Sequence, residues 1–337
     1  MRIAALRGDA VHRRRRRLRV LAGDPFALLG GAILPALAVV AIFTPRLAPH
    51  TTAELEDPLM FQTGQVQALA PPFWDRRGDD PCETCDPFEQ RFIPYDSRHL
   101  LGTDAMGRDM LSLLLYGMQY SLVYGVLAVA LIAAVGVALG LAAGWRGGVF
   151  DYVAMRAADV FDAAPAILAY ILVATVTAGL LAGVLTPLGL YLDAIPVTAL
   201  VLSSVGWAAT ARLVRGQVRA LKQEEWVLAA RAVGVPGARI ALRHLLPHAV
   251  GPAFVAATSL VPAMLIVEGF LNVIGIAGRP GYSLGTLVLS QFFHTVEAPW
   301  HVLMPTAVLI AIALAATALS DGAQRALDPT QSYHLGR

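Results

Sequence analysis

Long apolar stretches that contain almost no charged residue alternate along this chain with shorter polar segments. A helix that spans a bilayer needs about 20 apolar residues. Six stretches come close to or exceed this length, at 26–44, 121–144, 154–181, 189–211, 249–273 and 302–320. The pattern predicts an all-α polytopic membrane protein with six transmembrane helices.

The composition supports this prediction. Of the 337 residues, 56% are hydrophobic and 15% are charged, whereas soluble domains carry about 25% charged residues. A glycine-rich loop with the Lys-Ser/Thr ending of nucleotide-binding proteins is absent from the sequence. We also find no combination of nucleophile, base and oxyanion donor. We therefore expect no catalytic residue, no enzyme activity and no cofactor bound by this chain.

Basic residues predict the orientation in the membrane. Arg13–Arg17 and Arg19 precede the first apolar stretch, and short basic segments stay in the cytoplasm. With six spans both termini are then cytoplasmic, and 19 of the 26 Lys and Arg residues lie on that side. The arginine run fits a topology signal that also binds anionic lipids. A nucleic-acid-binding tract and a cleaved signal peptide are alternatives, although the apolar stretch is longer than the core of most signal peptides.

These considerations divide the chain into five parts. In order they are a basic cytoplasmic segment 1–25, a first transmembrane helix 26–45, an extracytoplasmic loop with an interfacial helix 46–118, a five-helix core 119–322 and a cytoplasmic tail 323–337.

Both cysteines, Cys82 and Cys85, lie in the expected outer loop. Their spacing suits zinc, redox chemistry or a tight disulfide. A structural zinc site needs four ligands, and neither a second Cys pair nor a nearby His pair accompanies them. A redox motif would need a strand–helix context. An oxidising compartment favours a local disulfide, with two free thiols as the alternative.

The end of the outer loop reads Leu101-Gly-Thr-Asp-Ala-Met-Gly-Arg-Asp109. Thr103 or Asp104 can cap a helix whose first turn lies near Ala105. The residues 111–116 would then lie along the outer membrane surface before the second span.

Two features stand out inside the membrane. Gly136, Gly140 and Gly144 recur every four residues, so they share one helix face and suit close helix packing. Glu268 lies deep in the fifth span, where a charge is costly unless it is paired or hydrated. It faces either a translocation path or a polar contact between helices. His244, His248, His294 and His301 fall on opposite sides of the membrane in this topology, so we expect no metal site among them.

The polar segment 212–248 is expected on the cytoplasmic side. Helical spacing continues to about Val233, Gly234 can end that helix, and Pro236 can begin another. Ala229 and Ala230 leave the helix backbone nearly bare, so a partner surface can approach closely. Three basic residues that flank the break could bind acidic or carbonyl groups on this partner, namely Arg231, Arg239 and Arg243.

Two strings resemble a known family, the membrane permeases of ATP-binding-cassette importers for dipeptides, oligopeptides and nickel, in their C-type subunit. The polar segment resembles the cytoplasmic coupling loop of these permeases at Glu225, Ala229, Ala230, Gly234, Leu246 and Pro247. The outer string matches their signature at Gly102, Thr103, Asp104, Gly107, Arg108 and Asp109. Departures occur at Leu228, His244 and His248 in the loop. An acidic residue is common in the family at Glu268, while Gly269 and Asn272 depart from the family string.

The resemblance implies a type I importer transmembrane domain, also called MetI-like, in the plasma (inner) membrane of a prokaryote. Besides the lipid bilayer, it implies three kinds of protein partner: a second permease, two cytoplasmic ATPases that bind ATP and Mg²⁺, and an extracytoplasmic solute-binding protein. No nucleic-acid partner is expected. Docking on the ATPases would fall to Arg231, Pro236 and the matched loop residues, and Glu268 and Asn272 would line the path. The cargo would be peptides or related small solutes. The alternative is a self-contained secondary transporter or channel that uses Glu268.

Overall fold

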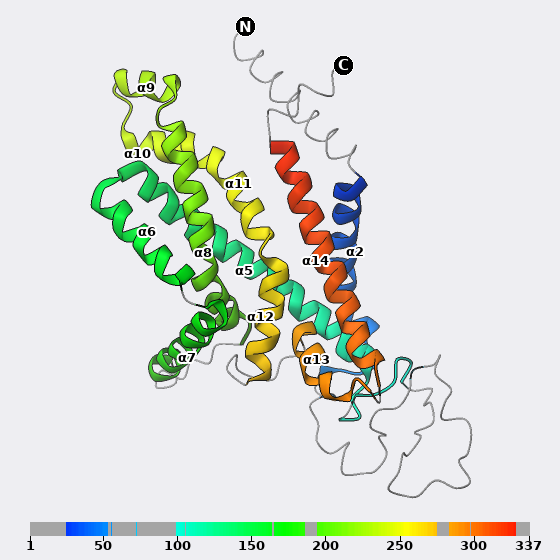
Figure 1. Cartoon of the computed structure of the whole chain (residues 1–337). Coiled ribbons are helices and arrows are strands. Elements are labelled where there is room, and N and C mark those ends of the chain that lie inside the picture. Colours follow the sequence, from blue (N-terminus) through cyan, green and yellow to red (C-terminus); the bar gives the residue numbers. More distant parts are fainter. Residues whose placement is uncertain are drawn as a thin grey trace, which may run out of the picture. The chain divides into compact units, whose positions relative to one another are not determined.

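The computed structural model describes residues 25–52, 55, 72, 99–104, 106–163, 165–185, 194–274, 283–296 and 298–327. Helices dominate this part, and the isolated β-bridge it contains joins Thr103 to Asp109. The all-α fold class is therefore confirmed. The main helices are α2 (Pro25–Leu47), α5 (Met110–Arg146), α6 (Gly148–Ala163), α7 (Ala166–Leu185), α8 (Ala194–Leu221), α9 (Glu225–Ala232), α10 (Gly237–Ile240), α11 (Leu246–Thr258), α12 (Val261–Val273), α13 (Leu284–Ser290) and α14 (Trp300–Leu327) (Figure 1).

Several helical stretches in the described part are long and apolar enough to cross a membrane. Four pass this test by themselves: Gly30–Leu47, Met110–Arg146, Gly237–Thr258 and Trp300–Arg325. A fifth span results if α6 and α7, which are bent by 111° relative to each other, count as one. The chain is thus a multi-pass membrane protein, and the number of six spans stays a prediction.

Three expected spans have different boundaries in the structure. The second expected span lies in the C-terminal two thirds of α5, an unbroken helix of 37 residues, so 111–116 belong to this helix and form no separate one. The third is divided into α6 and α7 at Pro165, which is consistent with a proline that disfavours helix in the residue before it. The fifth is divided into α11 and α12 by a turn at Ser259 and Leu260.

Other expectations fall outside the described residues. These are the arginine run Arg13–Arg17 with Arg19, the pair Cys82 and Cys85, and the last ten residues of the tail. Their predicted roles stay predictions.

The contacts divide the chain into two compact units. The first comprises Met1–Leu34, Gly125–Met264 and Ile312–Arg337, and the second Pro35–Tyr124 and Leu265–Ala311. In the first unit α8 is the central element, because it packs against α6, α7 and α11.

The glycine stripe of α5 packs closely against α8 in this unit. A Cβ atom on Gly140 would lie 2.5 Å from the Ala211 carbonyl oxygen, and one on Gly144 would lie 2.9 Å from Val218 Cβ. Gly136 meets Thr210 in the same way. Small residues let the two backbones approach, so the predicted packing role of the stripe is confirmed.

The second unit holds the start of α5 and the helix α13 around one hydrophobic cluster. Its buried members are Leu55, Met110, Leu113, Tyr116 and Leu287. The Ser121 hydroxyl of α5 also accepts a hydrogen bond of 3.0 Å from the Leu284 N–H at the start of α13. The beginning of α5 is therefore fixed by apolar packing and by a polar contact.

Candidate functional site

The polar segment 212–248 forms a hairpin of short helices in the first unit. α8 ends at Leu221, whose carbonyl accepts a hydrogen bond of 3.2 Å from the Glu224 N–H. Glu224 is extended, with φ −66° and ψ 142°, and α9 starts at Glu225. The sequence predicts one helix that continues to about Val233. In the structure this helix ends at Leu221, and after a turn α9 begins as a separate helix.

Gly234 ends α9, as the sequence predicts. Its φ is +81°, a left-handed conformation that glycine adopts without strain. The Val235 N–H donates to the Ala230 carbonyl at 3.0 Å, and the Gly234 N–H donates to the Arg231 carbonyl at 2.9 Å. These are the two hydrogen bonds of a Schellman motif. Pro236 is the residue just before α10, with φ −55°, so the break between the two helices is tightly defined.

Buried apolar residues hold the hairpin on the ends of the long helices. Val227 of α9, Ile240 of α10 and Leu245 are completely buried. They belong to one hydrophobic cluster with Val137 and Leu141 of α5, Val214 and Val218 of α8, and Ala249 and Ala253 of α11. The hairpin is thus packed onto α5, α8 and α11 through shared buried side chains.

Trp145, at the end of α5, is the largest side chain beneath the hairpin. The Arg231 guanidinium carbon lies 4.8 Å from its ring centroid, and Lys222 Nζ lies 5.4 Å away. Lys222 also donates a hydrogen bond of 2.6 Å to the Trp145 carbonyl. A Cβ atom on Gly237 would come within 3.0 Å of the indole. Trp145 therefore contacts both α9 and α10 and joins them to α5. Cation–π contacts at exposed sites contribute about 0.5–1 kcal/mol each.

An ion-pair cluster fixes α6 to α8 next to the hairpin. Asp151 of α6 is buried and pairs with Arg215 and Arg219 of α8. Arg215 Nη2 donates to Asp151 Oδ2 at 2.8 Å. Asp151 thus holds two arginine side chains near the C-terminal end of α8, where the hairpin begins.

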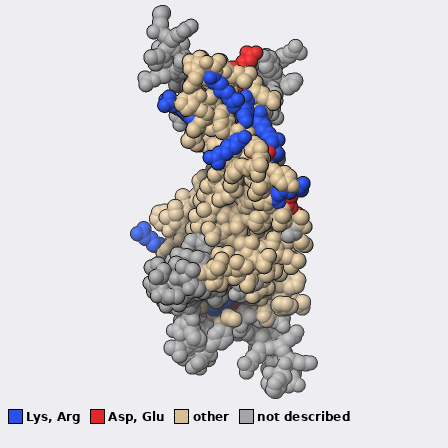
Figure 2. Space-filling view, turned by 90° about the vertical axis from the view of Figure 1, so that its left-hand side faces the viewer, with Lys and Arg blue, Asp and Glu red and all other residues tan. Residues whose placement is uncertain are grey.

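The outer surface of the hairpin is unusually apolar for a polar segment. Trp226, Leu228 and Val233 are 40%, 52% and 85% exposed. Figure 2 shows the Lys and Arg side chains of this side gathered near the end that carries α9 and α10. Of the residues that the sequence predicts for docking, six are exposed and two are half-buried: Glu225, Ala229, Arg231, Gly234, Pro236 and Pro247, then Ala230 and Leu246. Exposed apolar surface surrounded by charge is typical of a protein–protein contact.

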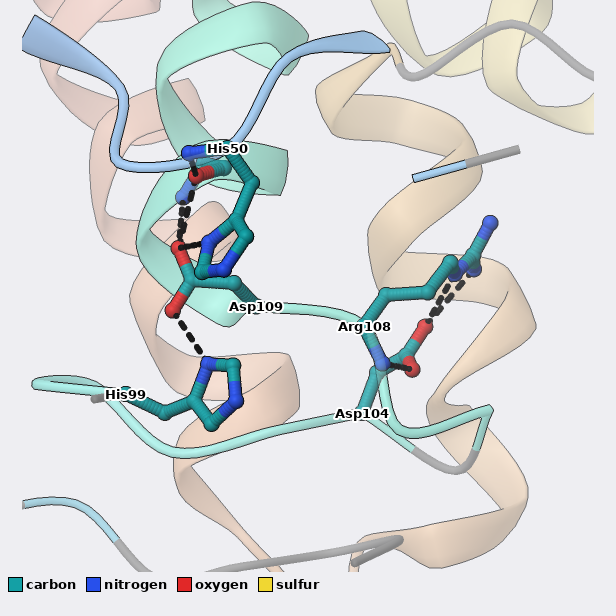
Figure 3. A network of polar contacts seen from close by, with 6 residues as sticks. His50, His99, Asp104, Arg108 and Asp109 are labelled. Carbon is teal, nitrogen blue, oxygen red and sulfur yellow. Dashed lines mark hydrogen bonds and ion pairs between the residues drawn. The ribbon is translucent and has the colours of Figure 1, made fainter. Parts of the chain in front are cut away.

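The outer string 101–109 folds into a closed loop in the second unit. Gly102 and Gly107 have φ of +80° and +71°, and the Met110 N–H donates to the Gly102 carbonyl at 3.0 Å. Asp104 is completely buried and accepts hydrogen bonds from the Arg108 N–H and Nε, both at 2.8 Å (Figure 3). The expectation that Thr103 or Asp104 caps a helix near Ala105 is therefore wrong. The left-handed glycines close a turn there, and Asp104 stabilises this turn.

Asp109 is the residue that caps the following helix. Its Oδ2 accepts hydrogen bonds from the Ser112 N–H at 2.8 Å and from Ser112 Oγ at 2.7 Å. Burial alone would raise the pKa of Asp109, but hydrogen bonds with His99 and Ser112 outweigh this effect and hold the pKa below its usual value. The Asp109 carboxylate is thus charged and fixed at the start of α5.

Two histidines that the sequence analysis did not consider contact this carboxylate. His99 Nδ1 lies 3.0 Å from Asp109 Oδ1, and His50 Nδ1 lies 3.8 Å from Asp109 Oδ2 (Figure 3). His50 follows the first span and His99 precedes the second, so both belong at the same membrane surface. This antiparallel topology is the signal that could have identified the pair, because no short sequence spacing connects them.

Glu268 and Asn272 lie side by side on α12 in the second unit. The Glu268 side chain is completely buried, and the Asn272 amide donates a hydrogen bond to its Oε1. Next to them, a Cβ atom on Gly269 would lie 2.4 Å from Gly285 Cα. This close approach explains why glycine stands at 269, where the resemblance leads one to expect alanine. The residues form a polar contact inside the unit, and their path-lining role stays a prediction.

The comparisons with known proteins agree with the family that the sequence resembles. The family described as "Binding-protein-dependent transport system inner membrane component" matches residues 136–333. The chain is 33% identical to the oligopeptide transport system permease protein OppC of Bacillus subtilis over 237 residues, which cover 70% of this chain and 73% of that protein. It is 34% identical to OppC of Escherichia coli K12 over 69% of this chain and 73% of that protein. It is 26% identical to the dipeptide transport system permease protein DppC of Lactococcus lactis over 92% of this chain and 88% of that protein. The chain therefore belongs to the family of inner-membrane components of binding-protein-dependent transport systems and is a DppC/OppC-like permease.

Proposed function

We propose that this chain is one of two permease subunits in an ATP-driven importer of peptides. The observation that carries the proposal is the hairpin around α9, which is held rigidly by buried side chains while its outer side exposes Trp226, Leu228 and Val233. The names of the relatives, oligopeptide and dipeptide permeases, support peptides as the cargo.

In this proposal the chain takes no part in covalent chemistry and binds no cofactor. ATP and Mg²⁺ bind to two partner ATPases that dock on the hairpin from the cytoplasm. A second permease completes the pore, and an extracytoplasmic binding protein delivers the peptide. The protein lies in the inner membrane with both termini in the cytoplasm, so the residues 46–118 face outward and 212–248 face inward.

The mechanism follows from the packing of the hairpin. When the ATPases close, they displace α9, and the buried residues Val227 and Ile240 pass this displacement to the helices beneath them. The helices then alternate between inward-facing and outward-facing states. ATP drives the exchange only to the extent that the ATPases bind the two states with different affinity. A rigid hairpin is needed, because a flexible one would absorb the displacement.

Substitution at Ala229 tests the docking role. Ala229 is exposed on α9, so Ala229→Glu introduces bulk and charge without a change in the helix core, and Ala229→Ser is the matched small control. We expect that Ala229→Glu abolishes co-purification of the ATPases and ATP-dependent peptide uptake, while Ala229→Ser retains both. The chain should be expressed together with its partner subunits.

Two results would contradict the proposal. One is wild-type ATPase binding and uptake in Ala229→Glu. The other is uptake by the purified chain in vesicles without any ATPase, which would indicate a secondary transporter. In that second case Glu268→Gln would be expected to abolish uptake.

A further inference from the structure

The side chains of His50, His99 and Asp109 converge beside the start of α5, all within the second unit (Figure 3). Each offers one possible ligand atom, and these atoms lie within 4.8 Å of one another. The two imidazole rings are stacked, with centroids 5.3 Å apart and 22° between their planes. Two nitrogen donors and one carboxylate thus lie close enough together to be candidate ligands of one ion.

The carboxylate is pre-organised for a cation. Asp109 is 2% exposed, and both Ser112 hydrogen bonds hold its Oδ2 in place. The neighbouring acid, Asp104, is occupied by Arg108, with Nη2 at 2.7 Å from its Oδ2. Asp109 has no such guanidinium partner in the described part of the chain, and the side chains that contact its carboxylate there are those of Ser112 and the two histidines.

His50 supplies an independent indication. Its Nδ1 atom is buried and makes no hydrogen bond to any described residue, although a buried polar atom without a partner costs about 1–3 kcal/mol. Its backbone N–H donates to Ser112 Oγ at 3.1 Å, which fixes the residue beside the carboxylate. A metal ion between these side chains would give the Nδ1 lone pair a partner.

The distances suit a tetrahedral ion. Zinc binds histidine nitrogen and carboxylate oxygen at about 2.0–2.2 Å, which places two tetrahedral ligand atoms about 3.3–3.5 Å apart. The separations of 3.0 Å and 3.8 Å between the Asp109 oxygens and the two Nδ1 atoms lie on either side of this value. The two separations involve different oxygens of Asp109, so the side chains must shift for one oxygen and both nitrogens to bind the same ion. Imidazole with carboxylate is a ligand set that zinc accepts and that magnesium and calcium do not prefer.

We propose that His50, His99 and Asp109 bind a Zn²⁺ ion with a water molecule as the fourth ligand. Both histidines bind as neutral imidazoles through Nδ1, with the proton on Nε2, so His99 exchanges its hydrogen bond to Asp109 for the metal bond. No oxidation or reduction takes place. The ion joins the segment after α2 and the segment before the outer loop to the start of α5. Bringing His50 and His99 together costs entropy, because it closes the chain between them. The bonds to the ion would offset this cost.

Zinc titration of the full chain in lipid nanodiscs tests the proposal, after treatment with a chelator. We expect one bound Zn²⁺ per chain and a rise in the melting temperature, since a ligand of the folded state stabilises it. Co²⁺ in place of Zn²⁺ should give the intense visible absorption of a tetrahedral site. Mg²⁺ at the same concentration should leave the melting temperature unchanged.

Variants assign the ion to these residues. His50→Phe retains the stacked ring and removes the ligand nitrogen. Because Nδ1 makes no hydrogen bond to a described residue, we expect the metal-free melting temperature to stay within the error. Zinc affinity should fall at least about 10-fold, the lower limit seen when a mere supporting residue of a metal site is removed. His99→Gln should cause a similar loss, but it also removes a hydrogen bond to Asp109, so His50→Phe is the decisive variant.

Two control variants separate this site from other candidates. His244→Ala/His248→Ala removes a pair four residues apart on the hairpin, and Cys82→Ala/Cys85→Ala removes the cysteine pair. Both should keep the zinc affinity and the visible cobalt band. Undiminished affinity in His50→Phe, or loss of the ion with either control, would overturn the proposal and leave the cluster as a hydrogen-bonded helix cap.

Discussion

The outer loop 101–109 and the hairpin around α9 are both polar segments between apolar helices, but they use their side chains in opposite ways. In the outer loop the charged residues are inside, since Asp104 and Asp109 are almost completely buried. In the hairpin the apolar residues are on both sides, with Val227 buried and Val233 85% exposed. The first segment turns its polar groups inward, and the second leaves apolar surface in contact with solvent.

This difference indicates which segment needs another protein. In the outer loop, Asp104 and Asp109 accept hydrogen bonds from Arg108 and from Ser112 at the start of α5, so these contacts form without a protein partner. The backbone of the hairpin is fixed by Gly234 and by Trp145, but Leu228 and Val233 leave apolar surface exposed in the isolated chain. Changes in the outer loop should therefore affect mainly stability, and changes on the surface of the hairpin should affect mainly docking.

The largest loss of stability is expected from Asp104→Ala. The substitution leaves two backbone N–H groups and the Arg108 side chain without the carboxylate that binds them. A buried donor without an acceptor costs about 1–3 kcal/mol, and more if it is charged, so we expect a fall of about 3 kcal/mol in the free energy of unfolding. Denaturation of the purified chain measures it.

The matched control for this variant is Asp104→Asn, which keeps one carbonyl oxygen as an acceptor and should lose less than half as much. ATPase binding by the folded fraction of Asp104→Ala should equal that of the unchanged chain. Lower ATPase affinity in this fraction would contradict the division of roles between the two segments.

Several features of the first unit can be predicted from the sequence alone. The uncharged stretches predicted the membrane helices, because burial in lipid requires about 20 apolar residues whatever their partners are. The spacing of Gly136, Gly140 and Gly144 predicted a packing face, and the position of Gly234 predicted the end of a helix. Each of these signals is local, and local rules of helix geometry decide its outcome.

The rest depended on contacts between distant residues. The local string predicts a helix cap at Thr103 or Asp104. In the structure the left-handed residues Gly102 and Gly107 form a turn, and Asp109 caps the helix that follows. The cluster of His50 and His99 around Asp109 arises from three segments that only the fold brings together. The same holds for Gly269, whose lack of a side chain is explained by Gly285 on another helix.

Gly234→Val should have the next largest effect on stability, and it concerns the frame of the hairpin. A β-branched residue at φ +81° costs about 1–2 kcal/mol, so the Schellman motif should open. Gly234→Asn is the matched control, because asparagine tolerates this conformation. We expect uptake per ATP hydrolysed to fall strongly for Val and slightly for Asn. Equal coupling ratios in both variants and the unchanged chain would contradict the need for a rigid break.

Trp145→Leu should cost about 1 kcal/mol, since it removes the contacts of Arg231 and Lys222 with the indole ring but keeps an apolar side chain. The ATPases should still bind, because the outer surface of α9 is unchanged. The looser connection to α5 should nevertheless lower the peptide uptake per ATP hydrolysed. The ratio of the two rates in reconstituted vesicles measures this, and an unchanged ratio would show that Trp145 has no part in transmission.

The smallest effect on stability and one of the largest effects on docking are expected from the same substitution, Val233→Ser. Val233 is 85% exposed, and surface substitutions of this kind usually change the free energy of unfolding by less than about 0.5 kcal/mol. In an interface, however, a valine buried by a partner contributes about 1.5 kcal/mol or more, which corresponds to roughly a 10-fold loss in affinity. Ile310→Ser, which also replaces an exposed apolar residue but on α14, is the control and should leave the affinity for the ATPases unchanged. If Val233→Ser weakened the fold and spared the docking, the hairpin would resemble the outer loop, and the contrast between the two segments would be lost.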